Sequence, residues 1–290
     1  MRSSWLPAVL LALTACDGGK DTDVDTDPPE ETAPEFTDVV IRFRAEAADV
    51  PFASNKEFKF LGSTGNATVK FGGLWVYLSN IGLLDASGSS TLLDLEPSMW
   101  QAENIGLLDF EDGSEYCTTG NPETNVELRG RVPTSDYTGL AFTIGIPPEV
   151  NHRELDTSAV GPLNRPELFN SVLYGYNYFS LLMSTLGERD GYPVYVRATG
   201  CQVDDGGNYA GCTADNIITV SLPSFDATTQ TVVFDLRELL AANNLDANAA
   251  SPAGAESAPG CQSDPTDPDC QSLFVKYGLA ALPPEWVRVE

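Results

Sequence analysis

The sequence predicts an all-β fold, an antiparallel β-sandwich with long loops and a few short helices. Three observations favour this fold class: short strand-like runs recur along the chain, turn-forming residues separate them, and helix-like periodicity is confined to three segments. The chain has 290 residues, 42% of them hydrophobic, and no internal repeat. We therefore expect one large domain rather than several.

The N-terminus has the pattern of an exported lipoprotein. Arg2 supplies a charged head, residues 5–13 are apolar, and Leu13-Thr14-Ala15-Cys16 resembles a lipobox. We expect residues 1–16 to be a signal peptide and Cys16 to be the lipidated first residue of a bacterial cell-envelope protein facing the periplasm or the outside. The apolar run is shorter than the roughly 20 residues of a membrane-spanning helix. A plain signal peptide with a coincidental cysteine is the alternative.

Residues 17–36 are acidic, rich in proline and without apolar periodicity, which predicts a disordered tether. Aspartates at positions 21, 23, 25 and 27 suggest a calcium loop, but the glycine and glutamate that such a loop needs are missing. We assign the folded domain to residues 37–290.

The first strand is expected at residues 38–45, where odd positions are apolar through Ala45 while Arg42 and Arg44 face the other way. Further strands are predicted at 68–71, 74–81, 91–95, 126–132, 140–146, 194–198, 217–222 and 231–235. Turn signals stand at 72–73, 85–88 and 111–114. Helical patterns are weaker, and they cover 165–182, 236–243 and 271–277, the last ending at Gly278.

The net charge of −26 excludes one class of partner. So acidic a surface repels phosphate backbones and anionic headgroups, so we expect no nucleic-acid binding and a membrane link through the lipid anchor alone. The acidic surface is either simply hydrated or binds a basic partner or cations.

Five cysteines follow Cys16, and in an exported chain they are disulfide candidates before they are metal ligands. Two short loops rich in Gly, Asp and Pro favour the sequential pairs Cys201–Cys212 and Cys261–Cys270 among three connectivities. Cys117 is then left over, either as a buried thiol or in place of a paired cysteine.

Motifs for catalysis are missing, and we expect no enzyme. The single histidine, His152, excludes two-histidine and three-histidine zinc sites. There is no G-x-S-x-G elbow and no glycine-rich phosphate loop, and with 42 acidic residues no carboxylate pair stands out. His152 follows two prolines in a long loop, where it is either a binding group or a histidine bonded to backbone or water.

A series of short motifs in one order resembles the MbnP-like family, also called metallo-mystery pair four-Cys motif proteins. The motifs are Tyr77-Leu78-Ser79-Asn80, Trp100-Gln101, residues 107–113 followed by Cys117, Tyr137-Thr138-Gly139-Leu140, Gly145-Ile146-Pro147, Asn151-His152, Pro162-Leu163-Asn164, Gly175-Tyr176, Thr199-Gly200-Cys201, Cys212 and the Cys261…Cys270 pair. They span residues 39–279, nearly the whole mature domain.

The resemblance implies an exported copper-binding β-sandwich whose four cysteines brace the fold. It also implies a partner, a MauG-like di-haem cytochrome c peroxidase, that oxidises a tryptophan to kynurenine. Histidines and the modified residue would then hold the copper, since imidazole and an aromatic amine supply nitrogen ligands.

This chain departs from that pattern at the ligands. Residues 168–176 contain no tryptophan and residues 195–201 no histidine, so His152 is the one imidazole ligand. Thioethers (Met99, Met183), carboxylates or a modified tryptophan would have to complete the site. Trp100 is the first candidate for oxidation and Trp75 the second, although either is also explained as a core or rim aromatic. The alternative function is an envelope scaffold of the same fold that has lost its copper ligands.

Overall fold

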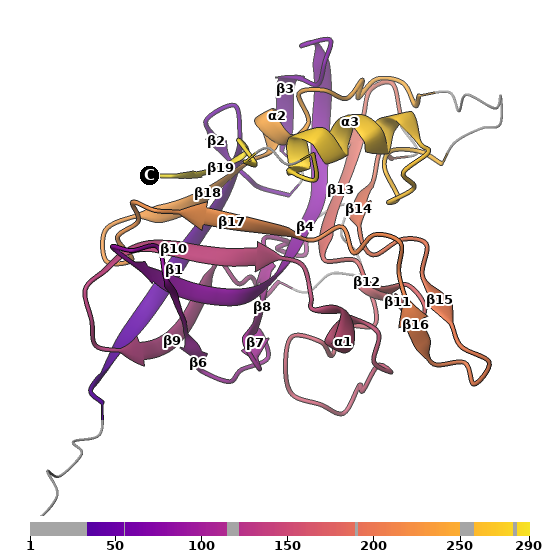
Figure 1. Ribbon diagram of the computed structural model, residues 1–290. Helices are drawn as coiled ribbons and strands as arrows, with labels where there is room; N and C mark the ends of the chain where they lie inside the picture. The colour runs from indigo at the N-terminus through magenta and orange to yellow at the C-terminus, as the bar shows by residue number, and fades with distance from the viewer. Residues whose placement is uncertain (1–33, 55, 115–121, 189–190, 250–257, 281–282) are drawn as a thin grey trace, which may run out of the picture. The chain divides into compact units, whose positions relative to one another are not determined.

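A computed structural model describes residues 34–54, 56–114, 122–188, 191–249, 258–280 and 283–290 (Figure 1). The predicted signal peptide, nearly all of the predicted tether, Cys16 and Cys117 lie outside these residues. Contacts divide the chain into two units, Met1–Pro34 and Glu35–Glu290, and the second is described here. Among the described residues no helix has the length and apolar character needed to cross a membrane.

Two sheets contain most of the strand residues, which confirms the all-β prediction. The first runs β19-β18-β1-β9-β6 with β2 paired to β1, and the second runs β14-β13-β4-β10-β17 with β3, β5 and β8 on β4 and β7 on β8. The first sheet comprises β1 (Phe36–Ala47), β2 (Val50–Pro51), β6 (Asp94–Leu95), β9 (Glu127–Pro133), β18 (Thr231–Asp235) and β19 (Val287–Val289). The second comprises β3 (Glu57–Leu61), β4 (Ala67–Asp85), β5 (Ser90–Leu92), β7 (Gln101–Ala102), β8 (Ile105–Asp109), β10 (Tyr137–Ile144), β13 (Phe179–Thr185), β14 (Val194–Val196) and β17 (Ile218–Leu222).

Aromatic side chains join the two sheets in one hydrophobic core. Phe43 of β1 meets Phe142 of β10 edge to face, with ring centroids 5.9 Å apart, and also contacts Phe234 of β18 at 5.8 Å. Trp286 is fully buried and lies 5.2 Å from Phe234. Burial of large apolar side chains between the sheets is the main stabilising contribution.

The predicted turn at residues 72–73 is wrong, because β4 runs unbroken from Ala67 to Asp85. Gly73 lies within the strand, and a Cβ there would come within 2.4 Å of the Trp75 ring. The glycine provides room for a neighbouring indole rather than a change of direction.

The predicted helix at 165–182 is also wrong. This segment contains β11 (Phe169–Ser171), β12 (Gly175–Tyr176) and the first half of β13, which pairs antiparallel with β4 from Phe179↔Val76 onward. Gly175 has φ +65°, a conformation that a helix interior does not use. The end of the segment forms a strand, and not a helix, because it pairs with β4.

The remaining helices are short. α2 (Leu236–Leu239) begins where the sequence predicts, with Asp235 as its N-cap, but ends four residues before the predicted limit. α3 (Pro268–Tyr277) ends at Gly278, which has φ +115°, as predicted. α1 (Pro148–Asn151) follows β10, and the hairpins β11–β12 and β15–β16 (Gln202–Val203, Tyr209–Gly211) form two small sheets of their own (Figure 1).

Candidate metal centre

His152 follows directly on α1, and its imidazole is largely buried, with 6% of the residue exposed. Its Nδ1 lies 2.8 Å from the carbonyl oxygen of Val172, which can only accept a hydrogen bond. Nδ1 therefore carries the proton and Nε2 the lone pair in the neutral ring. This tautomer is the one that a metal-binding histidine uses when a backbone carbonyl orients it.

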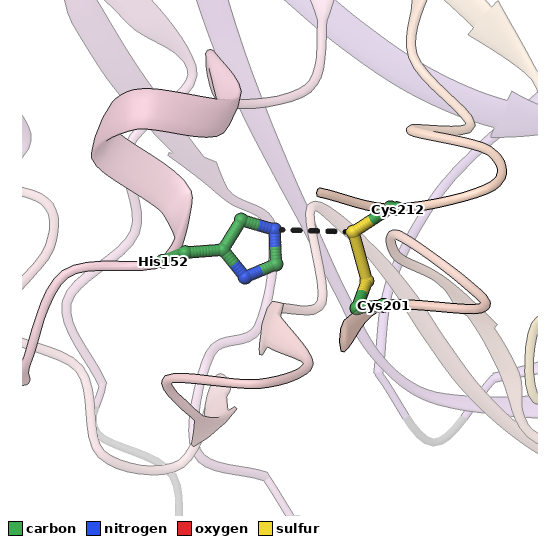
Figure 2. Close-up of side chains that lie close together, drawn as sticks. All are labelled: His152, Cys201 and Cys212. Carbon is green, nitrogen blue, oxygen red and sulfur yellow. Dashed lines mark hydrogen bonds between the residues drawn. A yellow bond between two sulfur atoms is a disulfide. The ribbon is translucent and has the colours of Figure 1, made fainter. Parts of the chain in front are cut away.

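The Cys201–Cys212 disulfide faces that lone pair. Nε2 of His152 lies 3.6 Å from Sγ of Cys212, and the dashed line in Figure 2 marks this contact. The imidazole nitrogen and the two sulfur atoms all lie within 4.8 Å of one another. The sequence predicted this disulfide and Cys261–Cys270, and the structure contains both, but the sequence gave no reason to place the first beside His152.

Two more residues fix the ring. Tyr209 of β16 stacks on it with centroids 3.9 Å apart and planes 7° from parallel. The side-chain amide of Asn151 lies 3.2 Å from Nε2, while its Oδ1 accepts a 2.8 Å hydrogen bond from the backbone N–H of Tyr176. The imidazole is thus held on one face and at both nitrogens.

Several motifs that carry the family resemblance meet around His152. Tyr77 donates from its hydroxyl to the carbonyl of Pro162 at 2.7 Å, and Tyr176 donates to the carbonyl of Leu163. The two tyrosine rings meet edge to face at 5.6 Å. Motifs that are far apart in the sequence therefore hold the same loop, at residues 162–163, in place. The spacing of the motifs along the chain could not show that they meet.

The two candidate tryptophans have different electrostatic neighbours, and the positive charge of Arg165 acts at both sites. The Trp75 indole donates a hydrogen bond to Asp109, a carboxyl whose pKa burial raises to about 7. Trp100 instead lies under the Arg165 guanidinium, 4.6 Å from the ring centroid. Both tryptophans are half-buried.

The candidate thioethers do not share one environment. Met183 is 5% exposed in β13 and belongs to the hydrophobic core, where a sulfur is not available to an ion from solvent. Met99 is 40% exposed beside Trp100. In the part of the chain that the structure describes, one group of His, Cys, Asp and Glu side chains is close enough to hold a metal, and it is His152 with the two disulfide-bonded cysteines.

Fold and site together define a β-sandwich protein that carries one buried imidazole against a disulfide. The sequence profile of the MbnP family matches residues 36–263, and the chain belongs to that family. The fold is similar to that of MbnP from Methylosinus trichosporium, with a TM-score of 0.76 and 26% identity over 88% of this chain and 98% of the other. No protein with a curated description matches the sequence significantly.

The family is associated with metal binding, and the described residues fit a copper ion only in part. His152 offers one nitrogen lone pair in the right tautomer. A disulfide sulfur is a poor ligand, because the metal-binding form of cysteine is the thiolate. With the disulfide closed, the group supplies one strong ligand, too few for tight binding.

Proposed function

We propose that this chain is an exported, lipid-anchored MbnP-family protein that binds copper through Nε2 of His152. The observation that carries the proposal is the Nδ1 hydrogen bond to Val172, which in the neutral ring leaves the lone pair on Nε2 and orients it. A buried imidazole held in this way is pre-organised for a metal, and imidazole is a preferred ligand of copper. No catalytic role is proposed for the chain, and we place it at the envelope through Cys16.

We further propose a MauG-like di-haem cytochrome c peroxidase as the partner that oxidises one tryptophan to kynurenine. The electrostatic surroundings favour oxidation of Trp75 over oxidation of Trp100, although the sequence makes Trp100 the first candidate. Removing an electron from an indole is easier when a carboxyl accepts its N–H bond, as Asp109 does for Trp75. A guanidinium over the ring, as at Trp100, opposes the positive charge that develops.

Peptide mapping tests this order of preference. After co-expression with the peroxidase, we expect the mass shift of kynurenine on the Trp75 peptide and an unmodified Trp100 peptide. Above pH 7, where Asp109 is ionised, an Asp109→Asn variant should lower the modified fraction, because the amide takes up the indole proton less readily than the carboxylate. Modification of Trp100 with Trp75 intact would reverse the assignment.

A second candidate function, a scaffold without metal, is favoured by the same site. Both nitrogens of His152 already have protein neighbours, and the facing sulfurs are bonded to each other. Under this alternative, the imidazole serves only to join α1 to the two small hairpins.

Metal analysis of the mature protein from its native envelope separates the two functions. Near-stoichiometric copper that collapses in His152→Ala supports copper binding. Tyr209→Phe is the matched control, because it keeps the stacked ring beside His152 and should retain the copper. Copper no higher in the unaltered protein than in His152→Ala would support the scaffold.

A further inference from the structure

We propose that the disulfide Cys201–Cys212 is a redox gate, and that its reduction completes a site for Cu(I) made of two thiolates and Nε2 of His152. The disulfide form then binds copper weakly, and the dithiol form binds it tightly. The inference rests on the proposed function in taking copper as the ion and His152 as its nitrogen ligand.

The distances match a three-coordinate centre. With metal–nitrogen and metal–sulfur bonds of about 2.0 and 2.3 Å, a trigonal arrangement separates the nitrogen and sulfur ligands by roughly 3.7 Å. Nε2 and Sγ of Cys212 are already 3.6 Å apart. To form the site, the two sulfur atoms have to move apart, and little other movement is needed. Two soft thiolates and one imidazole are ligands that suit Cu(I).

The surrounding backbone keeps the two cysteines close after reduction. Cys201 precedes β15 and Cys212 follows β16, and these strands pair from Gln202↔Gly211 to Val203↔Tyr209. On the other side of the disulfide, the backbone N–H of Thr199 donates to the carbonyl of Ala214 at 2.8 Å. Because backbone pairs flank the disulfide on both sides, opening it does not release the loop.

The imidazole is held independently of the disulfide. Its bond to Val172 and its stacking on Tyr209 involve neither cysteine side chain. Only the amide of Asn151, 3.2 Å from Nε2, must turn away to free the lone pair.

Burial makes the reduction selective. Cys201 and Cys212 are half-buried, whereas Cys261 and Cys270 are 0% exposed. A thiolate must reach a sulfur atom to exchange with it, so a reductant can attack Cys201–Cys212 but not Cys261–Cys270. The buried pair therefore serves as an internal reference for the integrity of the fold.

The step needs a dithiol reductant of the disulfide-exchange class. Its thiolate attacks one sulfur of Cys201–Cys212, the S–S bond breaks, and a mixed disulfide forms. The second thiol of the reductant then displaces the remaining cysteine, so two electrons and two protons pass to the protein and the reductant leaves as its disulfide. Binding of Cu(I) releases the two thiol protons to solvent.

The test compares the two redox forms of the full-length protein. One sample is kept oxidised, and the other is reduced with tris(2-carboxyethyl)phosphine and freed of it by gel filtration without oxygen. Alkylation with peptide mapping establishes which cysteines are reduced. Cu(I) is then added in competition with a chromophoric Cu(I) chelator, and the near-ultraviolet thiolate-to-Cu(I) absorption is recorded.

We expect reduction of Cys201–Cys212 with Cys261–Cys270 intact, and retention of Cu(I) against the chelator increased by more than about tenfold. The thiolate absorption should appear in the reduced form alone. Cys212→Ser should abolish it, and His152→Ala should weaken retention while leaving part of the absorption. Cys117→Ser, which alters a cysteine outside this group, should change neither.

Other outcomes separate the inference from the proposed function. Equal His152-dependent retention in both redox forms overturns the redox gate and leaves copper binding by His152 standing. Retention in neither form overturns both. Loss of the reduced-form signal in Cys117→Ser would move the sulfur ligand to that cysteine and overturn the assignment.

Discussion

Asp109, at the end of β8, is a carboxyl whose protonation depends on burial. It is 3% exposed, accepts a 2.9 Å hydrogen bond from the backbone of Glu111, and has its pKa raised to about 7 by desolvation. Between the unfolded pKa near 4 and about pH 7, the folded state holds a proton that the unfolded state lacks. The contribution of Asp109 to stability is therefore present at low pH and is lost as pH rises through 7.

We expect the Asp109→Asn variant to become progressively more stable, relative to the unaltered protein, as the pH increases. The amide cannot ionise, so the difference in free energy of unfolding should shift in the variant's favour by about 2–3 kcal/mol between pH 5 and pH 8. Urea unfolding at the two pH values measures it.

Asp85→Asn is the control for this prediction. Asp85 is exposed, and hydrogen bonds from the side chain of Ser87 and the backbone of Ser89 lower its pKa, so it is ionised throughout this pH range in both folded and unfolded states. Its effect should not change between pH 5 and pH 8. A constant difference for Asp109→Asn as well would mean that the buried carboxyl does not titrate in this range.

Sequence reasoning could identify His152 but not its surroundings. A lone histidine after two prolines stands out in any reading of the chain. Its partners Val172, Tyr209 and Cys212 come from three other segments, and no local pattern links them. Only the tertiary pairing of strands brings them together.

At the scale of elements, alternation of apolar residues predicted the longest strands, β1, β4 and β10, because the alternation of side chains between the two faces of a strand is a local property of the chain. The prediction failed where a glycine had a packing role, as Gly73 does beside Trp75, and where pairing with β4 overrode an apparent helical pattern at 165–182. Propensity is a weak guide at such positions, since neighbours in space decide.

The strand β12 should transmit a change at Gly175 to the imidazole. A Cβ there would lie 2.2 Å from Nδ2 of Asn151, the side chain that contacts Nε2 of His152. Gly175→Ala must displace Asn151 and break its bond to Tyr176, and we expect a loss of stability of about 2–4 kcal/mol. It should also shift the imidazole NMR signal, which one histidine makes unambiguous.

Gly65→Ala is a control matched in backbone conformation. Both glycines have φ +65°, but nothing lies within 4 Å of the Cβ that Gly65 would gain. It should therefore show only the strain of a left-handed alanine, about 1–2 kcal/mol, and leave the imidazole signal in place. If both variants gave equal losses and unshifted signals, Asn151 would not link β12 to His152.

At the scale of the whole molecule, 42 acidic residues outnumber 16 basic ones. Ion pairs such as Arg131–Asp94, more than half exposed on both sides, contribute little and weaken with salt. Repulsion among the unpaired carboxylates opposes the compact state and is also weakened by salt. Because the acidic residues are in such excess, relief of repulsion should exceed the loss of ion pairs.

We therefore expect the melting temperature at pH 7 to rise by about 2–4 °C as sodium chloride increases from about 0.01 to 0.15 M, where the Debye length falls from roughly 30 to 8 Å. Scanning calorimetry at fixed protein concentration measures the shift. Near pH 4.1, the isoelectric point calculated from the sequence, the same salt should raise the melting temperature little or lower it. A fall at pH 7 would mean that the ion pairs, and not the excess of negative charge, dominate the electrostatics of the fold.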